Sequence, residues 1–212
     1  MEAHRWSPLV AGLSLLGCYE EPVDSGTSAD PFADAVVSFS PGACAGFGQD
    51  ALPDVVLGPP RGAGENAGST DVVSLGELGE IVLRFDDRVV VDEDGPDLLV
   101  FENAFVGWPE TGVVAASPDG EVWSEWPCDP EDAEGGFPGC AGVQPVYADG
   151  EGDFDPTDPA AAGGDAFDLA AIGLAEARFV RVRDSGHNAC SADTGGFDLD
   201  ALAVVNGRVP EA

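Results

Sequence analysis

The chain has 212 residues, of which 40 are Asp or Glu and eight are Arg, with no Lys, so its formal net charge is −32. This charge excludes a protein that binds nucleic acid through general electrostatics, and it argues against broad contact with anionic lipid headgroups. The 29 Gly and 17 Pro residues, together with the lack of a long amphipathic helical pattern, predict many short strands joined by turns.

The first 17 residues have the pattern of an export signal. Arg5 precedes an apolar run that is too short to span a bilayer as a helix. This run ends in the sequence LLGC, which resembles a bacterial lipobox and implies that Cys18 is lipidated and begins the mature chain. By the same resemblance, Tyr19 stands where an aspartate would favour retention at the inner membrane, so we expect anchoring at the outer membrane or cell surface. The alternative is an ordinary signal peptide with a cysteine nearby.

Residues 18–34 are polar and acidic, which predicts a flexible tether between the lipid and a β-sandwich domain at residues 35–208. We expect this domain to be an all-β jelly roll of eight or nine short antiparallel strands, with long loops rich in Gly, Pro and Asp. In chain order, the segments with strand character are residues 35–39, 72–75, 81–85, 89–91, 97–102, 113–116, 122–126, 178–183 and 197–205. Turn residues predict hairpins around residues 76–80 and 117–120, and residues 167–172 are expected to form one helical turn.

The strand at residues 97–102, DLLVFE, is apolar on both faces, which indicates a central strand that is covered on both sides. Glu102 and Asn103 are then expected where this strand emerges at one end of the sandwich, a usual place for a binding site. The alternative is that the pair are ordinary turn residues.

Four cysteines remain after Cys18, and an even number in an exported chain predicts two disulfides. We favour Cys128–Cys140, which would close an acidic loop, and Cys44–Cys190, which would join an early loop to the loop before the last strand. A metal site of four thiolates is disfavoured, because the chain has no pair of cysteines separated by two residues.

Six segments between about residues 36 and 207 form a recognisable set: LGPPRG, DVVSLGELGEIVLRFDD, DGPDLLVFENAF, VVAASPDGEVW, GGDAFDLAAIGLAEARFVRVRD and GGFDLDALAVVNG. They resemble a group of secreted bacterial cell-surface proteins and lipoproteins of the discoidin-like, galactose-binding-domain superfamily. The resemblance implies a jelly-roll fold, often with one calcium ion at a loop end, and several members of the superfamily bind carbohydrate. On that expectation, the candidates for contact with sugar are Trp108, Trp123 and Trp126.

The last strand indicates a calcium site. Asp198 and Asp200 alternate with apolar residues and are expected to share a face with Leu202 and Val204. If that face belongs to the core, Asp200 needs a cation or several hydrogen-bond donors, since an unpaired buried charge is very unfavourable. Calcium prefers six to eight oxygen ligands, and the candidate ligands at strand and loop ends are Glu102, Asn103, Asp165, Asp168, Asp184, Asp198 and Asp200. The alternative is pairing with an arginine, for which Arg178, Arg181 and Arg183 are available.

Two further patterns are candidates for function. The alternating acids Asp149, Glu151, Asp153, Asp155 and Asp158 resemble a calcium loop, with a solvated acidic loop as the alternative. His187 is the one histidine after the signal and lies two residues from Ser185, but no triad geometry can be derived from the sequence. Catalysis by a pair of carboxylates, as in glycosidases, is a further alternative.

The sequence therefore predicts a surface lipoprotein with one calcium-supported β-sandwich, acting as a binding or structural module. We expect contact with the membrane through the N-terminal lipid only, a glycan or a surface protein as ligand, and no nucleic-acid partner. A discoidin-like carbohydrate-binding module is the first alternative, and an extracellular hydrolase the second.

Overall fold

Antiparallel strands make up the regular structure in the computed structural model, which describes residues 1, 29–152, 154–190, 192 and 194–211. The five-stranded sheet has the order β1 (Ala35–Ser40), β3 (Glu80–Arg84), β10 (Phe179–Asp184), β6 (Gly112–Ser117) and β7 (Ser124–Glu125). The four-stranded sheet has the order β2 (Val73–Ser74), β11 (Asp198–Val204), β5 (Leu98–Glu102) and β8 (Asp165–Phe167). A small third sheet has the order β12 (Gly207–Arg208), β4 (Val89–Val91) and β9 (Glu176–Ala177).

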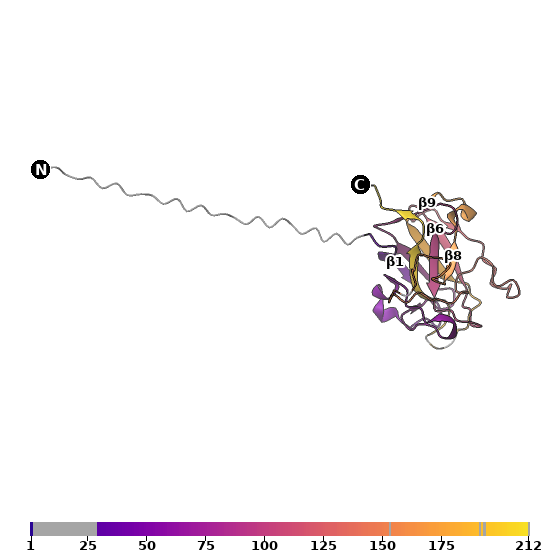
Figure 1. The fold of residues 1–212 in the computed structure, drawn as a ribbon. Helices are drawn as coiled ribbons and strands as arrows, with labels where there is room; N and C mark the ends of the chain where they lie inside the picture. The colour runs from indigo at the N-terminus through magenta and orange to yellow at the C-terminus, as the bar shows by residue number, and fades with distance from the viewer. Residues whose placement is uncertain (2–28, 153, 191, 193, 212) are drawn as a thin grey trace.

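Helical structure in the described residues is limited to four short 3₁₀ turns. These are η1 (Gln49–Ala51), η2 (Asp54–Val56), η3 (Gly64–Asn66) and η4 (Leu169–Ile172). None of the described helices has the length and apolar character needed to cross a membrane. The all-β sandwich predicted from the sequence is confirmed, and long loops extend beyond its strands (Figure 1).

The main core lies between the two larger sheets, where the alternation of each strand directs apolar side chains to the inside. Ile81 and Leu83 of β3 and Val180 and Val182 of β10 belong to the same buried cluster as Leu98 of β5. A second cluster covers the opposite face of β5 and includes Phe32, Leu99, Phe101, Val146, Ala148, Ala162, Ala201 and Ala203. The strand β5 is therefore buried on both faces, as its apolar sequence predicts.

Two predicted hairpins have different outcomes. The hairpin around residues 117–120 is confirmed, because β6 pairs with β7. The hairpin around residues 76–80 is wrong, because β2 pairs with β11 while β3 pairs with β1 and β10 in the other sheet. The chain crosses from one sheet to the other here. The backbone just after β2 bonds to the segment before β11 and not to β3, since Leu75 N donates to Phe197 O at 2.9 Å. The described residues form twelve strands, more than the eight or nine predicted, and four of these strands contain only two residues.

A β-bulge interrupts the alternation of β11. Leu199 pairs with Glu102 and Ala201 pairs with Phe101, so Asp200 is the extra residue. As a result, Leu202 and Val204 lie in the core cluster that contains Leu199. The predicted common face of Asp200, Leu202 and Val204 is therefore wrong, because the bulge reverses the direction of every side chain that follows it.

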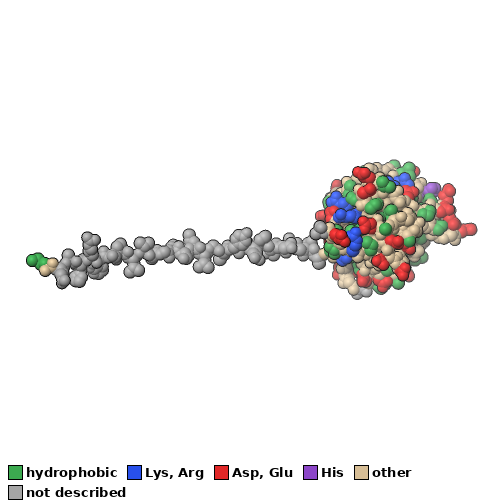
Figure 2. All heavy atoms as spheres, turned by 90° about the horizontal axis from the view of Figure 1, so that it is seen from above, with side chains coloured by type: hydrophobic (Ala, Val, Ile, Leu, Met, Phe, Trp, Pro, Cys, Tyr) green, Lys and Arg blue, Asp and Glu red, His purple; other side chains and the backbone are tan. Residues whose placement is uncertain are grey.

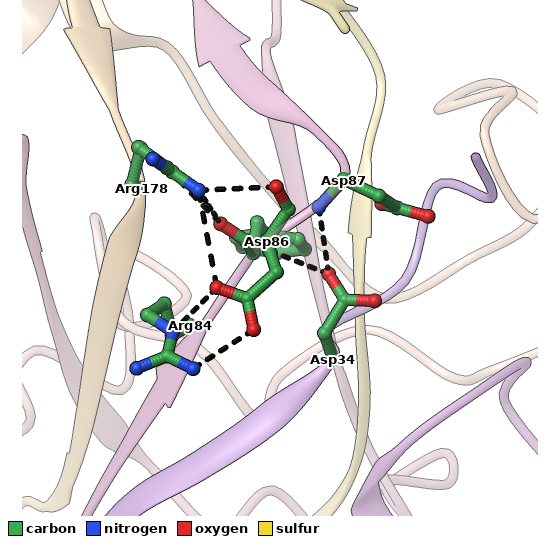
Figure 3. A network of polar contacts seen from close by, with 6 residues as sticks. Asp34, Arg84, Asp86, Asp87 and Arg178 are labelled. Atoms are coloured by element: carbon green, nitrogen blue, oxygen red, sulfur yellow. Dashed lines mark hydrogen bonds and ion pairs between the residues drawn. The ribbon is translucent and has the colours of Figure 1, made fainter. Parts of the chain in front are cut away.

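The end of the predicted tether packs onto the sandwich. Phe32 is buried and forms a bridge with Ala203 of β11. Figure 3 shows the carboxylate of Asp34 accepting hydrogen bonds from the backbone N–H groups of Asp86 and Asp87. Arg84 binds the carboxylate of Asp86 through two nitrogens, at 2.6 and 2.8 Å. Phe32 and Asp34 of the predicted tether thus contact the sandwich, whereas Cys18 and residues 2–17 of the predicted signal lie outside the described residues.

Both predicted disulfides are present, Cys44–Cys190 and Cys128–Cys140. The first joins residues 146 positions apart and the second closes a short loop. Stable disulfides are typical of oxidising compartments outside the cytosol, so the pair indicates an extracellular environment.

Candidate functional site

Three carboxylates meet at one end of the four-stranded sheet. Glu102 is the last residue of β5 and Asp198 is the first of β11, so antiparallel pairing of these strands brings them together. Glu110 joins them from the loop that leads into β6. One oxygen from each of the three lies within 4.8 Å of the others. Glu102 is 1% exposed and Asp198 is 7% exposed, while Glu110 is partly buried.

Each buried carboxylate of this cluster has one oxygen that accepts a hydrogen bond and one oxygen that accepts none from the described residues. Glu102 Oε1 accepts a hydrogen bond from Asp198 N at 3.3 Å, and Asp198 Oδ2 accepts one from Asn103 Nδ2 at 3.3 Å. Glu102 Oε2 and Asp198 Oδ1 are buried and have no hydrogen-bond partner among the described residues. A buried oxygen without a donor is unfavourable by about 1–3 kcal/mol, and by more when it carries charge.

The cluster strongly disfavours its own ionisation. Burial raises the pKa of Glu102 well above its usual range, and the charges of Glu110 and Asp198 add to the effect. Burial, with the charges of Asp198 and Asp184, raises the pKa of Glu110 to about 8. Burial raises the pKa of Asp198 to about 6, although the neighbouring side chains of Ser74 and Asn103 oppose this. At an effective dielectric constant of about 20, two unit charges 4.8 Å apart repel each other by roughly 3–4 kcal/mol.

No arginine relieves this repulsion in the described part of the chain. Arg178 pairs with Asp86, Arg181 with Glu80 and Glu125, and Arg183 with Glu125. Figure 2 shows acidic side chains spread over the visible face, while the arginines form a larger group on one side and a smaller patch near the upper edge. The arginine alternative proposed from the sequence is therefore wrong for the Glu102–Glu110–Asp198 cluster.

A pocket of about 330 Å³ opens over the cluster. It is lined by Asn103, Phe105, Trp108, Glu110, Ala189, Thr194 and Asp198. The rings of Phe105 and Trp108 are parallel, 6° apart in orientation with centroids separated by 6.4 Å, and Trp108 is 56% exposed. Ala189 and Thr194 belong to the loop that the Cys44–Cys190 disulfide attaches to the rest of the domain. The carboxylates are thus reached from solvent past an aromatic wall.

Asp184, a predicted ligand, instead holds loops in place. It is fully buried, and its Oδ1 accepts hydrogen bonds from Leu78 N and Gly186 N at 2.9 and 2.8 Å. Its Oδ2 accepts from Phe197 N at 2.9 Å and from the side-chain amide of Asn188 at 2.5 Å. Four donors satisfy the carboxylate, so a cation is not required.

Asp165 and Asp168 are also satisfied by the backbone. Asp165 Oδ2 accepts from Gly142 N and Val143 N at 2.7 and 2.9 Å, and burial raises the pKa of Asp165 to about 6. Asp168 caps η4 by accepting from Ala170 N at 2.8 Å.

Asp168 also belongs to a second acidic group, with Asp92 and Asp97. In that group the buried Asp97 accepts hydrogen bonds from Glu93 N, Leu169 N and the amide of Asn206, which makes it a structural anchor.

Asp200 lies in the bulge of β11, outside the cluster. It is 2% exposed, and its Oδ2 accepts a hydrogen bond from Arg61 N at 2.8 Å. Burial raises the pKa of Asp200 to about 8, and the charge of Asp71 contributes further. Of the seven predicted ligands, the structure brings together Glu102, Asn103 and Asp198 and disperses the other four. It adds Glu110, for which strand periodicity gives no signal because the residue lies in a loop.

The remaining sequence candidates have local roles. In the acidic run, Asp149, Asp155 and Asp158 each accept a hydrogen bond from a backbone N–H two residues later, while Asp153 lies outside the described residues. His187 Nδ1 contacts the backbone carbonyl of Ser185, whose hydroxyl bonds Thr111 Oγ1 at 2.7 Å, so the pair does not form a nucleophile and base.

The three candidate tryptophans lie in different environments. Trp126 is buried and donates from Nε1 to Asp168 O at 2.9 Å. The guanidinium of Arg181 lies over the ring of Trp123, with Arg181 Cζ 4.8 Å from the ring centroid. Trp108 is the one that lines the pocket over the acidic cluster.

Comparison with models of known protein families and with curated proteins finds no match for the chain. The likeness to discoidin-like surface proteins stays a prediction from the sequence.

Proposed function

We propose that the protein is a surface-anchored lipoprotein whose β-sandwich binds one calcium ion between Glu102, Glu110 and Asp198 and serves as a binding module. The observation that carries this proposal is the pair of buried oxygens, Glu102 Oε2 and Asp198 Oδ1, that no donor in the described residues satisfies. A cation between them would supply the missing partner and remove the mutual repulsion of the carboxylates.

The donor set favours calcium over other metals. All three side chains offer oxygen, and neither histidine nor cysteine belongs to the group, which disfavours zinc and copper. Calcium accepts irregular shells of six to eight oxygens, whereas magnesium requires near-octahedral geometry with shorter bonds. A site with two fixed buried carboxylates and an open pocket suits the larger, more tolerant ion.

The location of the protein is supported by two independent features. The LLGC sequence ending at Cys18 supports lipid anchoring, and the two disulfides support an oxidising compartment. Extracellular calcium sites bind typically in the range of about 10⁻⁴–10⁻³ M. An ion bound so weakly would occupy the site outside the cell, where calcium is abundant.

Calorimetric titration of calcium-free protein with calcium tests the proposal. We expect one site in the wild type and loss of binding in Asp198→Asn, which keeps the size of the side chain but removes its charge. The matched control is Asp200→Asn, two residues away on β11, which should bind calcium as the wild type does. Equal binding by both variants, or no binding by the wild type, would contradict the assignment.

A hydrolase is the second candidate, and it is favoured by the pKa of Glu110. With a pKa raised to about 8, this carboxyl stays protonated at neutral pH beside two other acids, as a general acid requires. A hydrolytic activity that Glu110→Gln abolishes in calcium-free buffer would support this candidate.

A further inference from the structure

We propose that the groove between β8 and the loop closed by the Cys128–Cys140 disulfide binds a basic peptide segment of a partner protein, with one apolar side chain of the peptide in a hollow beside Trp126. The residues that line this groove are different from those that line the pocket over the acidic cluster. The inference therefore does not depend on calcium binding.

Two adjoining hollows form the groove. The first has a volume of about 480 Å³ and is lined mainly by apolar groups, among them Trp126, Pro127, Pro138 and Ala171. The second, of about 340 Å³, lies against β8 and shares Trp126, Pro138 and Ala171 with the first. Hollows of this size can accept an apolar side chain, and burial of such a side chain is favourable.

The walls of the groove are held in position before any partner binds. Trp126 is 4% exposed, and its Nε1 donates to Asp168 O at 2.9 Å. Its ring meets the ring of Phe167 edge to face, with centroids 5.1 Å apart. The Cys128–Cys140 disulfide ties together the two ends of the loop that forms the other wall. A partner would therefore lose little affinity to the ordering of this surface.

The charge of the loop selects a cationic partner. Residues 129–139 include four acids in eleven positions, about twice the frequency in the whole chain, namely Asp129, Glu131, Asp132 and Glu134. No basic residue lies between Arg88 and Arg178 in the sequence. Among the described residues, the one ion pair to these four acids joins His187 Nε2 to Glu131 at 3.8 Å. Positive side chains beside an apolar anchor would match this largely uncompensated charge.

The position of β8 favours a peptide over a small organic cation. In the described part of the chain, β8 is the outer strand of its sheet and pairs only with β5. Ala166, at the centre of β8, is exposed. An outer strand can offer backbone N–H and C=O groups to an added extended segment. Alternate side chains of that segment would then point toward the hollow and away from it.

Two consecutive alanines provide a matched pair of variants. Ala170 and Ala171 are both exposed on η4, but only Ala171 lines the hollows. Ala171→Trp should fill the space for the anchor without any change of charge. Ala170→Trp adds the same bulk beside the groove and should bind the peptide as the wild type does.

A second pair of variants tests the charge. Replacement of the four loop acids by their amides should weaken binding by about fivefold, because exposed ion pairs to the peptide are lost. The matched control removes four charges from the other acidic loop, by Asp149→Asn, Glu151→Gln, Asp155→Asn and Asp158→Asn. This control should leave the affinity within about twofold of the wild type, since distant charges are screened at physiological salt.

The experiment is a nuclear magnetic resonance titration of isotope-labelled protein at physiological salt with three synthetic peptides, acetyl-GRLRG-amide, acetyl-GRSRG-amide and acetyl-GELEG-amide. We expect GRLRG to shift the indole N–H signal of Trp126, GRSRG to bind about tenfold more weakly without its anchor, and GELEG not to bind. Ala171→Trp should reduce the affinity for GRLRG to that for GRSRG.

Three results would overturn the inference. Equal affinity for GRLRG and GRSRG would show general attraction between opposite charges, without an anchor site. An affinity for GRLRG that Ala171→Trp leaves unchanged would place the peptide elsewhere, as would a titration that leaves the Trp126 signal unmoved. The absence of binding to the wild type at millimolar GRLRG would remove the site altogether, and none of these results bears on the calcium proposal.

Discussion

At the scale of single residues, the two oxygens of each buried carboxylate in the site have different surroundings. One oxygen of Glu102 receives the N–H of Asp198, and the other is buried without a donor. A carboxylate with a purely structural role is expected to accept hydrogen bonds through both oxygens. Asp184 does so, from four donors. The contrast distinguishes a structural carboxylate from one that is left open for a ligand.

Glu102→Gln should therefore have opposite effects with and without calcium. In EDTA at pH 8 the variant should be at least as stable as the wild type. Burial raises the pKa of the Glu102 carboxyl and makes its ionisation unfavourable in the folded state, whereas Gln cannot ionise. In calcium it should gain little of the stabilisation that the wild type gains. Chemical denaturation in the two buffers measures both effects, and a variant equally destabilised in each would assign Glu102 a purely structural role.

Asp184→Ala should destabilise the fold by about 3–5 kcal/mol, because it leaves the four donors that bond Asp184 without their acceptor. The loss should be the same in calcium and in EDTA if Asp184 is only an anchor. A loss confined to the calcium-containing buffer would instead make Asp184 a ligand.

At the scale of elements, the bulge of β11 separates two buried acids that simple alternation would place together. Asp198 precedes the bulge and joins the cluster, while Asp200 lies in it and bonds Arg61 N. The bulge could not be predicted from the sequence of β11 alone. It is a shift in the register between β11 and β5, and it depends on how the two strands pair. Glu110 was missed for a related reason, since only the path of a loop brings it to Glu102.

Other elements were predictable because their causes are local. The apolar residues 98–101 of β5 indicated a strand covered on both faces, and the turn residues at 117–120 indicated the β6–β7 hairpin. The disulfide pairs followed from the number of cysteines and from which loops could meet. The two-residue strands β9 and β12 were not predicted, because they are too short to produce any periodicity.

Asp200→Asn should flatten the pH dependence of stability without changing the response to calcium. The pKa of Asp200 is about 8 in the folded state against 3.8 for the free side chain, so its contribution to stability is present at low pH and is lost as the pH rises through about 4 to 8. The variant keeps an acceptor for Arg61 N and should exceed the wild type in stability by about 5 kcal/mol at pH 8, and by only about 1 kcal/mol near pH 4.5. Parallel curves for the two proteins over this range would show that Asp200 is already neutralised by a partner.

At the scale of the whole molecule, the net charge of −32 means that added cations can stabilise the fold in two ways, by general screening or by binding at one site. Diffuse repulsion destabilises the compact state and is relieved by any salt, whereas a specific site is stabilised by the ion that fits it. The disulfides and the buried cores hold the fold together in either case, so calcium should add to a domain that is already folded.

The most direct test is the melting temperature of the wild type in calcium, in magnesium and in EDTA at one fixed ionic strength. Binding to the folded state alone adds about 2.7 kcal/mol at a hundredfold excess over the dissociation constant. We predict that calcium raises the melting temperature by several degrees, that magnesium raises it less, and that Asp198→Asn removes the difference between the two ions. A melting temperature that responds equally to both ions, or to neither, would contradict a calcium site at Glu102, Glu110 and Asp198.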